Sequence, residues 1–172
     1  MTKYYKAIND YTLYLNTNFN CTKTVNGSSK NTEFSWTIPE VEIEDLGYLQ
    51  VVNVVAVGAS TSLPYVLRLK GGVEYNSTFN FSTDYGYPIL SVFTVANGVS
   101  VGGTSGDYGI TLRPQTIRNI TISVSDSLSN NTNGVSTTTE FMFVLKVAEV
   151  DAKVSQVGDP YREGRSNLNL KL

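Results

Sequence analysis

Apolar residues in this chain recur at every second position or in short continuous runs, and not at the spacing of an amphipathic helix. The alternation is clear in 34–38 and in 117–124, and it is typical of strands with one buried face. A valine-rich run at 48–57 is typical of a strand buried on both sides. Other strand-like segments are 11–15, 65–69, 89–95, 99–101, 110–112 and 141–150. The pattern predicts about eight strands and no helix.

Glycine, asparagine and proline separate these segments at intervals of about ten residues. Asn26–Gly27 and Asn97–Gly98 are pairs that tight turns prefer, and Gly71–Gly72 is expected to turn a hairpin into 73–75. Pro39 is expected to end the strand 34–38, because proline cannot donate to a sheet ladder. Many short strands with regular turns predict an all-β fold, an antiparallel β-sandwich or barrel.

The chain is long enough for one domain with its own core. It has 172 residues, of which 41% are hydrophobic and 16% charged. Trp36 shares a face with Phe34 and Ile38, so we expect it in the core rather than at an interface. We expect one domain over residues 1–150, followed by a polar C-terminal tail or arm over residues 151–172 with too few apolar residues to build a core.

The absence of histidine limits the chemistry most strongly. It removes Ser–His–Asp and Cys–His nucleophiles, the usual general base near neutral pH and the commonest metal ligand. The net charge is −2 with scattered lysines and arginines, so no nucleic-acid footprint is expected. Cys21 is the single cysteine and cannot form a disulfide within the chain. We expect no enzymatic activity, no cofactor and no membrane span.

An acidic run is the one pattern with a metal-binding interpretation. Glu40, Glu42 and Glu44 would share a face of an extended segment, with Asp45 next to them. Calcium needs several oxygen ligands that converge on one point, and carboxylates spaced along one strand do not converge. We therefore expect a solvated edge that discourages aggregation, and no metal site.

Two segments supply the candidate subunit interface. Aromatic residues alternate with Asn and Ser between 75 and 87, a mixture typical of binding surfaces, although rings packed on the sandwich would give the same pattern. The tail carries scattered basic residues and could add a strand to a neighbouring protein or stay without order. The candidate interface residues are Tyr75, Phe79, Tyr85, Tyr87, Arg162 and Arg165.

Two stretches carry a resemblance to a known family. They are Phe34-Ser-Trp-Thr-Ile-Pro-Glu-Val-Glu-Ile, followed by Gln50-Val-Val-Asn-Val-Val, and Leu112-Arg-Pro-Gln-Thr-Ile-Arg-Asn-Ile-Thr-Ile-Ser-Val-Ser-Asp. Over roughly residues 34–150 the chain resembles small capsid proteins, pentons and minor capsid proteins, of nucleocytoplasmic large DNA viruses. The resemblance implies a single jelly roll of about eight strands, with five copies closing each vertex of an icosahedral capsid.

On this resemblance the chain is a structural virion protein, made in the host cytoplasm and built into the capsid. The expected partners are copies of itself, as in a homopentamer, and other capsid proteins. The alternatives are a minor capsid protein at another shell position and a glycan- or receptor-binding β-sandwich. A hydrolase with paired carboxylates is disfavoured, because acidic residues cluster only at 40–45.

Overall fold

Eleven strands and no helix make up the part of the chain that the computed structural model describes, which is residues 7–58, 64–75, 87–96, 99–103, 110–125 and 134–150. The all-β prediction is therefore confirmed. The strands are β1 (Ala7–Asn16), β2 (Cys21–Val25), β3 (Lys30–Ile43), β4 (Leu46–Val57), β5 (Tyr65–Gly71), β6 (Ile89–Ala96), β7 (Val99–Gly103), β8 (Ile110–Leu112), β9 (Gln115–Ser125), β10 (Val135–Ser136) and β11 (Glu140–Val150).

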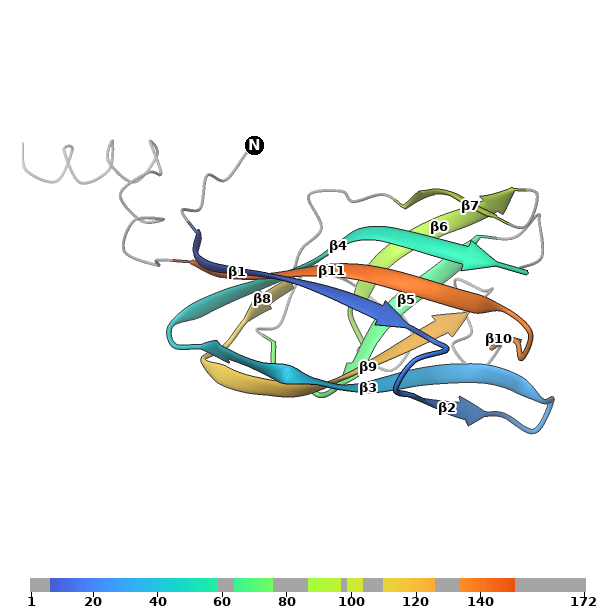
Figure 1. The fold of residues 1–172 in the computed structure, drawn as a ribbon, viewed down its shortest axis with the longest axis horizontal. Helices are drawn as coiled ribbons and strands as arrows, with labels where there is room; N and C mark the ends of the chain where they lie inside the picture. Colours follow the sequence, from blue (N-terminus) through green and yellow to red (C-terminus); the bar gives the residue numbers. More distant parts are fainter. Residues whose placement is uncertain are drawn as a thin grey trace, which may run out of the picture.

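The strands form two layers in a sandwich-like arrangement, and every pairing between them is antiparallel (Figure 1). One layer has the order β1-β11-β4-β8. The other has the order β3-β9-β5-β6-β7, with β2 and β10 also paired to β3. A single pair, Val57 with Val99, joins β4 to β7 and links the two layers into one hydrogen-bonded path.

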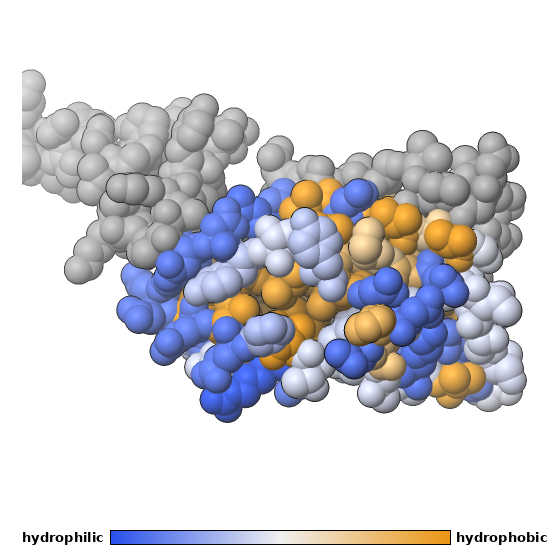
Figure 2. Space-filling view, in the orientation of Figure 1, coloured by the Kyte–Doolittle hydropathy of each residue, from blue (hydrophilic) through white to orange (hydrophobic). Residues whose placement is uncertain are grey.

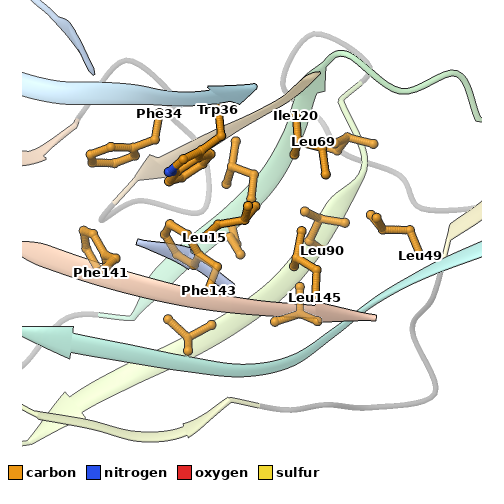
Figure 3. Close-up of a cluster of buried hydrophobic side chains, with 14 of the residues drawn as sticks. Leu15, Phe34, Trp36, Leu49, Leu69, Leu90, Ile120, Phe141, Phe143 and Leu145 are labelled. Atoms are coloured by element: carbon orange, nitrogen blue, oxygen red, sulfur yellow. The ribbon is translucent and has the colours of Figure 1, made fainter. Parts of the chain in front are cut away.

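Aromatic side chains from opposite layers meet in the core. Phe34 and Trp36 of β3 face Phe141 and Phe143 of β11 (Figure 3). The ring centroids lie 5.8 Å apart for Phe34 and Phe141 and 5.9 Å apart for Trp36 and Phe143, both in edge-to-face geometry. All four side chains are buried, as are Ile120 and Ile122 of β9. The prediction that Trp36 belongs to the core is confirmed.

Pro39 does not end its strand, so that prediction was wrong. β3 continues through Pro39 to Ile43. The register between β3 and β9 shifts between Thr37 and Val41, so the proline lies in an irregular stretch of the ladder. A bulge is one of the few places where a sheet tolerates a residue without an N–H donor. Beyond it, Val41 and Ile43 return to the core.

The hairpin predicted at Gly71–Gly72 is also wrong. β5 ends at Gly71, and the chain turns at Gly72 with a φ of 82°. Within the described residues, the segment 73–75 forms one isolated bridge, from Tyr75 to Leu112, and no strand against β5. The glycine is needed because its backbone lies directly against the backbone of β9.

Two strands escaped the sequence prediction. β2 has the residues Cys-Thr-Lys-Thr-Val and pairs along the outside of β3, and β10 has two residues. The predicted turn at Asn26–Gly27 joins β2 to β3, and the Asn26 side-chain oxygen accepts the N–H groups of Ser28 and Lys30, both at 3.0 Å. The Asn97–Gly98 turn lies outside the described residues, although Ala96 and Val99 on either side of it are paired.

We predict that Gly72→Ala lowers the free energy of unfolding by about 2 kcal/mol or more, since a left-handed backbone strains any other residue. A Cβ at this position would lie 2.1 Å from the Asn119 carbonyl oxygen of β9. Gly27→Ala is the matched control, because a Cβ there meets no atom within 4 Å. Urea unfolding of both variants measures the difference. Equal stability of the two variants would contradict the placement of Gly72.

Candidate functional site

The predicted interface residues fall partly within the described chain. Tyr75 and Tyr87 are both half-buried, whereas Phe79, Tyr85, Arg162 and Arg165 lie outside the described residues. Tyr75 packs against the core and forms a bridge to Leu112, the last residue of β8. Tyr87 precedes β6 and lies beneath the Lys70 ammonium, which is 4.8 Å from its ring centroid. The two tyrosines thus have different partners, Leu112 for Tyr75 and Lys70 for Tyr87.

The chain beside Tyr75 is held by one glutamine. The Gln115 side-chain oxygen accepts the backbone N–H of Glu74 at 2.8 Å. Its amide nitrogen donates to the Arg113 carbonyl at 3.0 Å and also to the Glu74 carbonyl. These bonds hold the backbone of Glu74 against the turn between β8 and β9. The next residue, Tyr75, is therefore held in place at the end of the sandwich.

Tyr87 belongs to a small charged group on the outer face of the β3-β9-β5 layer. Lys70 of β5 contacts Glu33 of β3 at 2.7 Å while its ammonium lies over the Tyr87 ring. The two charged side chains are about one quarter exposed, at 24% and 28%. The Lys70 ammonium is attracted both by the Glu33 carboxylate and by the Tyr87 ring, so these three side chains form one polar patch.

The same outer face carries more buried polar side chains than the sequence suggested. The Ser35 and Thr121 hydroxyls lie 2.9 Å apart, and the register places Arg68 beside Ser123. Arg68 is 1% exposed and does not belong to the apolar core cluster. An arginine stays charged when buried, so its position in the fold is strongly constrained. The sequence placed Arg68 in the strand-like segment 65–69 and did not indicate that its side chain is buried.

The acidic run behaves as expected for solvated side chains. Glu40, Glu42 and Glu44 are exposed, while Val41 and Ile43 between them are buried. Glu40 makes an exposed ion pair with Arg118 at 3.3 Å. Within the described residues, no three acidic or cysteine side chains come close enough together to hold a metal ion.

The edge strand β1 has apolar side chains that are only partly covered. On its inner side Tyr11 and Leu13 pack against the core but stay half-buried, and on its outer side Tyr14 is 68% exposed. Figure 2 shows hydrophobic residues at the surface between β1 and β3, flanked by hydrophilic ones. Sequence reasoning identified β1 as a strand but missed its position at a sheet edge, because pairing order is a property of the whole fold.

Neither the models of protein families, nor the curated proteins, nor the solved structures contain a match to this chain. In the described part of the chain no helix could cross a membrane. The function must therefore be argued from the chain's own surfaces and topology.

The Cys21 thiol gives a test of the local structure. Burial raises its pKa above the ordinary value, although a backbone hydrogen bond from Ser35 and the charge of Lys23 oppose the shift. A raised pKa leaves less thiolate, so we predict slower alkylation by iodoacetamide at pH 8 in the folded protein than in urea. The difference should narrow as the pH rises past the pKa. The effect of urea on the reaction itself is corrected with a free cysteine peptide. Equal alkylation rates in the folded and unfolded protein at pH 8 would contradict the partly buried position of Cys21.

Proposed function

We propose that the chain is a non-enzymatic structural subunit of an icosahedral viral capsid, folded as a single jelly roll, and that it serves as the vertex protein. The nested order of its strand pairs carries the proposal. It is supported by the resemblance of residues 34–43, 50–55 and 112–126 to small capsid proteins.

The nesting is clear when the three strands β2, β7 and β10 are set aside. The eight remaining strands pair first with last, second with seventh, third with sixth and fourth with fifth, namely β1 with β11, β3 with β9, β4 with β8 and β5 with β6. Such an order arises when one long antiparallel ribbon is rolled around a core. The lateral pairs β11–β4 and β9–β5 then complete the two layers. This arrangement supports a jelly roll, a fold used by capsid proteins and lectins.

The chemistry of the chain favours assembly over catalysis. With no histidine it lacks the residue that most often binds a catalytic metal or acts as a base. Asn, Ser and Thr make up about 30% of the residues, well above ordinary usage. Uncharged polar surfaces cost less to desolvate than charged ones, which suits a subunit that buries much of its surface against neighbours.

A closed ring of subunits needs two different surfaces that fit each other head to tail. The patch of Glu33, Lys70 and Tyr87 provides one such surface on the β3-β9-β5 layer. We propose that this patch contacts the adjacent subunit of the ring. Tyrosine is one of the residues that contribute disproportionately to the binding energy of an interface.

Native mass spectrometry of the full chain tests the proposal, and we expect a pentamer. Tyr87→Ala should move the monomer–pentamer midpoint to a concentration at least about fivefold higher, since loss of an interface aromatic costs about 1 kcal/mol or more. Phe19→Ala is the control: it removes an aromatic that is 73% exposed in the turn after β1, away from the patch, and should leave the midpoint unchanged.

The outcomes separate the capsid subunit from the second candidate. A glycan- or receptor-binding module is favoured by the lectin use of the same fold and by the exposed ring of Phe19. A chain that stays monomeric at all concentrations and binds a glycan array would support that module and overturn the vertex assignment. A stable oligomer other than a pentamer would indicate a different shell position.

A further inference from the structure

We propose that two copies of this chain pair through the outer edge of β1, antiparallel, with the two Thr12 residues facing each other across a twofold axis. Throughout the described residues β1 pairs with β11 alone, so its other side is an open sheet edge. The pairing would join the β1-β11-β4 layers of both copies into one continuous sheet. This contact does not depend on the ring proposed above.

The edge lacks the devices that normally prevent strands from pairing. Natural edges carry lysines, prolines or bulges, or are very short. β1 has ten residues, no lysine and no proline. Its irregularity lies at the start, between Ala7 and Asn9, and leaves the rest in regular register. Its one charge, Asp10, is held by Lys146 of β11 at 2.7 Å.

The direction of the backbone N–H and C=O groups decides which residues of β1 can bond to a strand added at its open edge. Thr17 donates its N–H to the Phe141 carbonyl, in the register that continues from β1. Because backbone groups of a strand point alternately to either side, odd-numbered residues bond to β11 and even-numbered residues face outward. At the far end the Asn16 carbonyl accepts the Trp36 indole N–H at 2.9 Å, which closes the edge there. The open run is therefore Asp10–Tyr14.

This run is complementary to itself. With Thr12 on the axis, Thr12 faces Thr12, Asp10 faces Tyr14 and Tyr11 faces Leu13 of the second copy. Each facing pair at an even position exchanges both backbone hydrogen bonds. Threonine pairs stabilise antiparallel sheets, and no two like charges lie opposite each other. In this register the side chains of both copies alternate between the same two faces of the joined sheet. Apolar residues of one copy therefore meet apolar residues of the other on the core side.

The pairing also covers the half-buried residues below the edge. Tyr11 and Leu13 would each gain an apolar neighbour from the second copy. A five-residue strand contact buries less than the roughly 1,600 Å² of a standard stable interface. The pair is therefore weak in solution, and it gains strength where many copies are held together, because linked contacts add avidity.

Sedimentation velocity over a wide concentration range tests the pairing. The full chain should show a reversible association that doubles the mass of its smallest species. Thr12→Pro should weaken this association at least about tenfold, since it removes the central outward N–H. It should leave the fold intact, because that N–H does not bond to β11. An association unchanged by Thr12→Pro, or no association in the unmodified chain, would overturn the proposal.

Charge exchange tests the register itself. Thr12→Lys and Thr12→Glu should each lose the pairing, because like charges would face each other, and an equimolar mixture should pair again. A mixture that does not pair would overturn the Thr12-centred register. Thr12 is exposed but lies opposite Lys146 of β11, so the melting temperature of each variant is measured to separate a folding defect from a loss of pairing. If the chain also forms a ring, sedimentation velocity detects the pairing of one ring with another. Thr12→Pro should then prevent this pairing and leave the mass of the single ring unchanged.

Discussion

The fold depends on the contact between the aromatic side chains of β3 and β11 across the core. Phe34 and Trp36 lie on the strand that is second in the nested order, and Phe141 and Phe143 lie on the last. Their contact holds the two layers together face to face, where the backbones are too far apart to form hydrogen bonds with each other. The Trp36 indole also donates to the Asn16 carbonyl and so fixes the end of β1 against the opposite layer. Packing across the core and the polar contacts of Asn16 thus decide where the open edge of β1 stops.

Side-chain alternation was enough to predict the strands with a clear inner face, such as 34–38 and 117–124, because burial of one face imposes a period of two. It failed at Pro39, where a shift in register accommodates a residue that a regular ladder would exclude. It also missed β2, whose polar residues pair outside β3 and bury little. These errors share a cause. Local patterns report burial, whereas bulges and outer strands depend on partners that are distant in sequence.

The candidate surfaces were predictable to different degrees. Their aromatic character identified Tyr75 and Tyr87, but composition did not show that one is fixed beside β8 and the other beneath Lys70. The sequence placed Arg68 in a strand, and its burial follows only from the folded arrangement. No sequence pattern predicts that β1 lies at an open edge. Once this position is known, the sequence of Asp10–Tyr14 shows that the run can pair with itself.

The two proposed contacts differ in symmetry, and this difference has a structural consequence. A ring requires a head-to-tail contact between two unlike surfaces, whereas β1 facing β1 uses the same surface on both copies. The Glu33, Lys70 and Tyr87 patch lies on one layer of the sandwich and β1 borders the other, so one contact need not displace the other. A subunit with both kinds of contact can close a ring and also join that ring to a neighbour. Weak edge pairing suits the second task, because a wrongly placed subunit can leave an assembly only when its single contacts dissociate easily.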